Sequence, residues 1–112
     1  MVQYSHRLDS TFGALSDPTR RGIIERLGHR DASISELAGD FDMTLTGIGK
    51  HVGVLEQAGL VTTEKRGRVR TCRLRPRRLD AVSRWIAKYR RMQEERFDRL
   101  GEFLERTKGE ES

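Results

Sequence analysis

Apolar residues in the first half of the chain recur at steps of three and four, the spacing that places them on one face of a helix. A short apolar turn of helix is expected over residues 10–15. A second helix is expected next, because Asp17 has the residue type of an N-cap and Pro18 that of a first helical position. Gly28 is expected to end this helix in a left-handed conformation, and residues 29–33 are expected to form a polar link.

Two further helices are predicted within residues 35–58, joined by a tight turn. Ser35 is the expected cap of the first, which covers residues 36–41, and Thr44 is the expected cap of the second. The small residue Ala38 is expected where the two helices cross. The buried face of the second helix is expected to consist of Ile48, Val52 and Leu55. This pattern predicts a helix-turn-helix, in which the second helix enters the major groove of DNA.

The segment after the helix-turn-helix predicts a β-hairpin over residues 60–75. Its two strands are expected over residues 60–65 and 69–75, and Gly67 supplies the positive φ of the turn between them. A hairpin that directly follows a helix-turn-helix is the element order of a winged helix. The predicted fold class is therefore mainly α with a small β-hairpin, a winged helix-turn-helix.

The C-terminal part of the chain is predicted to form one long helix over residues 77–107, because its apolar residues fall mainly at steps of three or four. A helix of about 30 residues spans about 45 Å, more than a domain of this size covers by itself. We therefore expect its apolar face to pair with a second copy of the chain. A helix folded back on its own core is the alternative. The residues predicted to form this dimer contact are Leu79, Val82, Trp85, Ile86, Tyr89, Met92, Phe97 and Leu100.

Length and composition favour one domain over residues 1–112, since 35% of the 112 residues are hydrophobic and 35% are charged. The chain has no apolar run of about 18 residues and no apolar stretch near its start, so we expect no membrane span, no secretion signal and a cytoplasmic location. The single cysteine, Cys72, excludes an internal disulfide and a cysteine-based zinc cage. Strand alternation favours a buried thiol at Cys72 over a redox switch.

The net charge of +5 is concentrated in one segment. Residues 61–78 contain eight basic residues and one acidic residue, so this segment has a net charge of +7 and the rest of the chain has −2. The distribution predicts that the hairpin approaches a polyanion, while the rest of the chain packs and dimerises. An arginine-rich hairpin that is only solvated is the alternative.

Three segments carry a resemblance to a known family: LSDPTRRGIIERL, ISELAGDFDMTLTGIGKHVGVLEQAGLV and KRGRVRTCRLRP. Over nearly the whole chain the sequence resembles the ArsR-type family of bacterial winged-helix repressors. The resemblance implies a homodimer clamped through its first and last helices, which adds Phe12 and Leu15 to the predicted dimer contact. It also implies binding to an inverted-repeat operator in double-stranded DNA, and repression of transcription until a signal releases the protein.

The predicted DNA contacts lie at the start of the fourth helix and in the hairpin. Leu45, Thr46 and Lys50 are expected to point outward at the end of the helix that enters the groove. Thr46 can meet a base edge or a thymine methyl group, Leu45 can make an apolar base contact, and Lys50 can reach a base or a phosphate. The full set of predicted DNA-binding residues is Thr44, Leu45, Thr46, Gly47, Gly49, Lys50, His51, Lys65, Arg66, Arg68 and Arg70.

Three glycines in this helix, Gly47, Gly49 and Gly53, each cost it about 1 kcal/mol relative to alanine. We expect that they let the helix backbone approach DNA closely. Weak local selection on a helix supported by tertiary contacts is the alternative. His51 is expected to contact phosphate or to pack within the fold, with pH sensing and metal binding as the alternatives.

Enzymatic and metal-sensing functions are not favoured by the sequence. The chain has no glycine-rich phosphate loop, no nucleophile elbow and no spaced acid–base motif. The ArsR-type family includes metal sensors, but here residues 36–40 contain no cysteine, the last helix contains no histidine, and the three histidines are scattered. We therefore expect no metal and no other cofactor. A small organic ligand, a protein partner and no effector at all stay open as the releasing signal, and a winged-helix module that binds protein or RNA is the alternative function.

Overall fold

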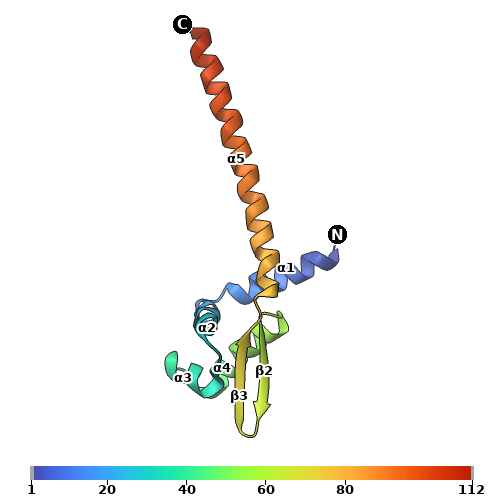
Figure 1. Ribbon diagram of the computed structural model, residues 1–112, viewed down its shortest axis with the longest axis vertical. Helices are drawn as coiled ribbons and strands as arrows, with labels where there is room; N and C mark the ends of the chain where they lie inside the picture. The colour runs from blue at the N-terminus through green and yellow to red at the C-terminus, as the bar shows by residue number, and fades with distance from the viewer. Residues whose placement is uncertain (1, 112) are drawn as a thin grey trace. The chain divides into compact units, whose positions relative to one another are not determined.

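The computed structural model describes the backbone of residues 2–111 and the side chains of residues 7–107. The described chain divides between residues 82 and 83 into two compact units. In chain order, the elements shown in Figure 1 are α1 (Val2–Leu15), α2 (Pro18–His29), β1 (Ala32–Ser33), α3 (Ile34–Asp40), α4 (Leu45–Gln57), β2 (Val61–Arg66), β3 (Val69–Leu74) and α5 (Arg77–Glu111). The helix pair α3–α4 followed by the β2–β3 hairpin confirms the predicted winged helix-turn-helix fold.

The β2–β3 hairpin has the predicted place and a tighter turn than expected. The two strands pair in antiparallel register as far as Arg66 opposite Val69, so that only Gly67 and Arg68 lie between them. Gly67 has a φ of 62°, which confirms its predicted role in the turn. Hereafter we call this hairpin, Val61–Leu74, the wing.

A third strand lies beside the wing, where the sequence predicts a polar link. Ala32 and Ser33 form β1 and pair with β3, with Ala32 opposite Cys72, and the strand order is β1-β3-β2. The prediction of a link is therefore wrong for these two residues. A strand of two residues carries no periodicity of its own, and its partner lies in a distant part of the chain.

The ends of two helices also differ from the predictions. The expected left-handed end of α2 at Gly28 is wrong, because the helix continues to His29 and leaves through Arg30 in an extended conformation, with φ at −169°. The expected cap of α3 at Ser35 is wrong as well. Ser33 is the cap, since its Oγ accepts a hydrogen bond of 3.0 Å from the N–H of Glu36. The Glu36 side chain accepts one of 3.3 Å from the N–H of Ser33, which completes a capping box.

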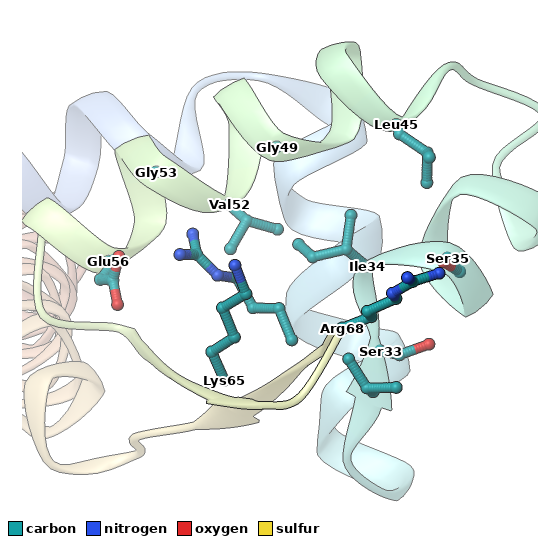
Figure 2. Close-up of a pocket in the computed structure, with 12 residues that line it drawn as sticks. Ser33, Ile34, Ser35, Leu45, Gly49, Val52, Gly53, Glu56, Lys65 and Arg68 are labelled. Carbon is teal, nitrogen blue, oxygen red and sulfur yellow. The ribbon is translucent and has the colours of Figure 1, made fainter.

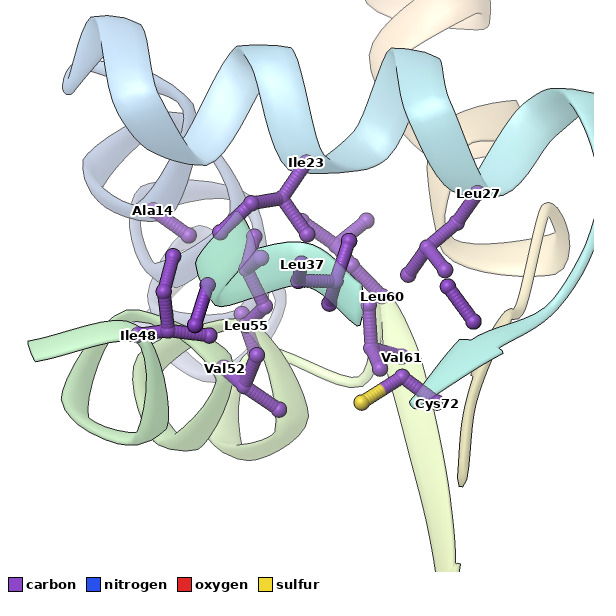
Figure 3. Close-up of a cluster of buried hydrophobic side chains, with 13 residues drawn as sticks. Ala14, Ile23, Leu27, Leu37, Ile48, Val52, Leu55, Leu60, Val61 and Cys72 are labelled. Carbon is purple, nitrogen blue, oxygen red and sulfur yellow. The ribbon is translucent and has the colours of Figure 1, made fainter. Parts of the chain in front are cut away.

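The core of the first unit is formed by side chains from the helices α1 to α4, from the turn after α4 and from the sheet (Figure 3). Ala38, the small residue expected where α3 crosses α4, is buried in this core, and its carbonyl accepts a hydrogen bond of 3.0 Å from the N–H of Met43 in the turn. The predicted stripe on α4 is confirmed as buried, and the largest fully buried side chains are Ile23, Leu37, Ile48, Leu55, Leu60, Val61 and Cys72. This packing fixes one face of α4 inward and leaves the other face open.

The outer helices are longer than the sequence pattern predicts. α1 begins at Val2, ahead of the expected turn over residues 10–15. α5 begins at Arg77, as predicted, and extends past residue 107 to Glu111, a length of 35 residues. In the second unit, the rings of Trp85 and Tyr89 stack with their centroids 5.7 Å apart. None of the helices, over the residues described, is long and apolar enough to cross a membrane.

Candidate nucleic-acid interface

The start of α4 is fixed by a cap and is open to solvent. Oγ1 of Thr44 accepts a hydrogen bond of 3.0 Å from the N–H of Gly47, which satisfies one of the unpaired amides of the first turn. Leu45 and Thr46 are both exposed, and 57% of the surface of Leu45 is accessible. Lys50 is exposed one turn further along. Leu45, Thr46 and Lys50, which the sequence assigns to DNA contact, are therefore all open to solvent.

A groove of about 450 Å³ lies beside this surface, between α4 and the wing (Figure 2). Gly49 and Gly53 lie on its α4 side, and Lys65 and Arg68 reach it from the wing. The first residues of α3 and the strand before it, around Ile34, form a third side. The structure thus brings five of the predicted DNA-binding residues to one groove: Leu45, Gly49, Lys65, Arg68 and Arg70.

Some cations of the wing repel one another in the free protein. Lys65 lies directly opposite Arg70 in the β2–β3 register, and like charges in that position repel. Among the side chains that the structure describes, ion pairs form at Arg66, with Glu64 at 3.1 Å, and at Arg73, with Asp31 at 2.9 Å. The hydrogen bond to Asp31 raises the pKa of Arg73. Within the same described set no carboxylate lies within 4.0 Å of the cations that line the groove.

His51, on α4, does not line the groove and instead packs against the start of α2. Its Nδ1 is 3.4 Å from Nη1 of Arg20 and 3.9 Å from Oδ2 of Asp17, and 22% of its side chain is exposed. Asp17 is the predicted N-cap of α2, and the backbone N–H of Arg20 that donates to its carboxylate, together with His51, lowers the pKa of Asp17. The sequence leaves two roles open for His51, phosphate contact and packing within the fold. In the structure His51 packs within the fold.

The glycines of α4 differ in what surrounds them. A Cβ on Gly47 would lie 3.1 Å from Oγ1 of Thr44 and 3.3 Å from Cε of Met43, so this glycine has a packing reason within the chain. A Cβ on Gly49 or Gly53 would meet nothing within 4 Å. Close approach of DNA is therefore needed to explain glycine only at Gly49 and Gly53, which line the groove.

Several further residues line the groove that the sequence pattern does not predict as DNA contacts. Glu56 and Val69 line the groove, and so do Ser33, Ile34 and Ser35. Glu56 lies three residues after Gly53 on the same side of α4, so helical spacing alone indicates it. The residues around β1 carry no comparable signal, because their position depends on the strand that the local pattern does not reveal.

The predicted dimer residues fall into two groups. Leu15 and Leu79 are partly buried against the core of the first unit, and Val82 is buried, so these three are largely covered by their own chain. Phe12 is 37% exposed on α1. The remaining residues, all 44% to 68% exposed on α5, are Trp85, Ile86, Tyr89, Met92, Phe97 and Leu100, and Phe103 and Leu104 continue the series.

Cys72 lies in the core, as strand alternation predicts. Burial raises the pKa of its thiol to about 11, with a further contribution from the nearby carboxylate of Glu56. The thiol is thus protonated and inert near neutral pH. Over the described side chains, no three His, Cys, Asp or Glu residues are grouped so as to hold a metal ion.

Comparison with known proteins yields consistent matches. A family model described as a helix-turn-helix domain matches residues 15–64. HTH-type transcriptional regulator Rv2034 of Mycobacterium tuberculosis is 38% identical over 74 residues, which are 66% of this chain and 69% of that protein. Transcriptional repressor SdpR of Bacillus subtilis is 32% identical over 60 residues, 54% of this chain and 67% of that protein. The crystal structure of an ArsR family transcriptional regulator matches with a TM-score of 0.77 and 44% identity, over 84% of this chain and 97% of the other.

Proposed function

This chain belongs to the ArsR family of winged helix-turn-helix transcriptional regulators, and we propose that it represses transcription by binding an inverted-repeat operator in double-stranded DNA as a homodimer. The similarity to a transcriptional repressor of Bacillus subtilis supports the repressor role. The single observation that carries the DNA contact is the groove in which the open face of α4 meets unneutralised wing cations.

Phosphate is the ligand that makes the charge arrangement of the wing favourable. Lys65 and Arg70 repel each other across the strands, and a phosphate between them would attract both. Neutralising phosphates releases counterions from DNA, which gives sequence-independent affinity that falls as salt rises. Arg68, at the turn of the wing, extends the same cationic surface.

Base recognition is assigned to the start of α4. Leu45 and Thr46 stand at the N-terminal end of the helix, the end that enters a major groove in helix-turn-helix proteins. An exposed leucine offers an apolar surface to a thymine methyl group, and the threonine offers both a methyl and a hydroxyl group. Lys50 follows within reach of a base or a phosphate.

Dimerisation is assigned to α1 and α5. The apolar side chains of α5 beyond Val82 are about half exposed in one chain, and a second copy would cover them. Two linked copies would present two α4 helices to half-sites about one turn of DNA apart, which is the geometry of an inverted repeat.

Selection of bound duplexes from a random pool, followed by titration of the selected duplex at several salt concentrations, tests the proposal. Arg68→Ala is expected to weaken binding to all duplexes and to reduce the salt slope by about one, whereas Thr46→Ala is expected to change base preference. Arg91→Ala removes an equal charge from α5 and is the control. Equal affinity for single-stranded RNA and for the selected duplex would contradict the proposal and favour the RNA-binding alternative.

A further inference from the structure

The groove between α4 and the wing contains one acidic side chain among the residues described. Glu56 lies in the last turn of α4, at the opposite end of the helix from Leu45. Its carboxylate faces a groove that is otherwise lined by the cations of the wing and by neutral residues. A negative charge at this place opposes phosphate binding, so its presence in a DNA-facing groove needs an explanation.

The carboxylate is held in place by the wing. Oγ1 of Thr63, on β2, donates a hydrogen bond of 2.7 Å to Oε2 of Glu56. The distance is that of a strong hydrogen bond to a charged acceptor. This bond joins α4 to the wing and fixes the position of the carboxylate. Without it, the long exposed side chain of Glu56 would sample several conformations.

Among the described side chains, no lysine or arginine lies within 4.0 Å of the Glu56 carboxylate, so no ion pair neutralises it. The charge is also felt nearby, because it contributes to the raised pKa of Cys72. Its field therefore reaches any strand of phosphates that lies near the last turn of α4.

We propose that Glu56 is a specificity-determining residue, whose carboxylate, fixed by Thr63, repels the sugar–phosphate strand of any duplex that slides toward the last turn of α4. The inference rests on the proposed function. A duplex that is docked by base contacts at Leu45 and Thr46 is held at the other end of the helix. A duplex held only by phosphate contacts has no such anchor, so it meets the repulsion more often. Glu56 thus weakens non-specific binding more than operator binding, which is a form of selection by repulsion.

Glu56→Gln tests the inference, because the amide keeps the size of the side chain and can still accept a hydrogen bond from Thr63. The affinity for non-operator duplex is expected to rise about two- to sixfold at low salt, with a smaller rise for the selected operator. The difference is expected to shrink at high salt, where exposed charges are screened. Glu25→Gln makes the same chemical change on the exposed surface of α2, outside the groove, and is expected to change neither affinity.

Thr63→Val separates the position of the charge from its presence. This variant keeps the carboxylate but releases it, so non-operator affinity is expected to rise by less than in Glu56→Gln. The double variant is expected to match Glu56→Gln alone, because the hydroxyl acts through the charge. A thermal unfolding curve for each variant checks that the fold is retained.

Equal changes in operator and non-operator affinity on Glu56→Gln, or none, would overturn the inference and leave the proposed function standing. A loss of operator affinity would overturn it too, since Glu56 would then contact a base. Failure of the unmodified protein to bind any duplex at low salt would end both proposals.

Discussion

Gly59 and Gly49 differ in whether the fold itself requires a glycine. Gly59 follows α4 with a φ of 76°, a left-handed conformation that costs other residues about 1 to 2 kcal/mol, so the turn into the wing requires it. Gly49 has helical geometry and open space where a Cβ would be. No described atom lies within 4 Å of a Cβ at this second position, and we propose that close approach of DNA offsets the cost of glycine to the helix.

We predict that Gly49→Ala stabilises the protein and weakens DNA binding at the same time. The methyl group has no described atom within 4 Å and improves helix propensity, so the free energy of unfolding is expected to rise by about 1 kcal/mol. The same methyl group stands where the strand of DNA is proposed to pass, so affinity for the operator is expected to fall. Urea unfolding and fluorescence anisotropy measure the two effects.

Gly39→Ala is the matched control for this prediction. Gly39 is an exposed helical residue in α3 with nothing within 4 Å of the added Cβ, and it does not line the groove. It is expected to gain stability with no change in affinity. Unchanged operator affinity in Gly49→Ala would show that DNA does not approach this part of α4.

At the scale of elements, the parts that the sequence predicts are those whose signals are local. The inward stripe of α4 determines which residues point outward, so Leu45 and Lys50 are placed correctly by spacing alone. The wing is equally local, since a turn glycine and two adjacent strands suffice. Local spacing therefore predicts which residues of α4 and the wing face the groove, while their contacts with DNA stay predictions.

The third side of the groove depends on a long-range contact. β1 consists of Ala32 and Ser33 and exists because it pairs with β3. Ser33 is both the last residue of β1 and the cap of α3, so Ser35 lies inside the helix, where it lines the groove. Both serines have the residue type of a cap, and the local sequence does not distinguish them. The position of His51 also depends on a long-range contact. It lies against Asp17 and Arg20 at the start of α2, and the spacing of residues within α4 does not indicate this contact.

We predict that the two serines differ in their effect on stability. Ser33→Ala removes the hydroxyl that accepts from the N–H of Glu36, and it is expected to cost about 1 kcal/mol in the free energy of unfolding. Ser35→Ala changes an exposed residue inside the helix and is expected to cost little or to stabilise slightly. Urea unfolding of the two single variants measures the difference. Equal losses in both would mean that the capping box does not contribute.

At the scale of the whole molecule, the helix proposed to dimerise is tied to the helix proposed to bind DNA. Nε of Arg20 donates to the carbonyl of Ala14 at 2.7 Å, and its Nη2 donates to that of Gly13 at 3.2 Å, which holds the last turn of α1. The same guanidinium contacts His51 on α4. Arg20 therefore links α1 directly to α4. A partner chain that packs on α1 would contact a helix that Arg20 ties to the proposed DNA-binding helix.

The contribution of α5 to operator affinity is also a property of the whole molecule, because it depends on dimerisation. Its apolar side chains beyond Val82 are largely exposed in one chain, and the first unit forms its own core without them. We predict that Phe97→Asp combined with Leu100→Asp converts a dimer to a monomer while the first unit stays folded. Each aspartate would place an unpaired charge in the apolar contact between copies, which costs several kcal/mol.

The loss of the dimer is expected to lower operator affinity by about a hundredfold or more, because the second α4 no longer binds at the high local concentration that linkage provides. Affinity for a single half-site is expected to stay the same, since the groove of each first unit is unchanged. Sedimentation measures the mass and anisotropy measures both affinities, and Arg91→Asp, which adds an aspartate on the polar side of α5, is the control. A double variant that sediments as a dimer, or a monomer that binds the full operator as tightly as before, would contradict the assignment of α5 to dimerisation.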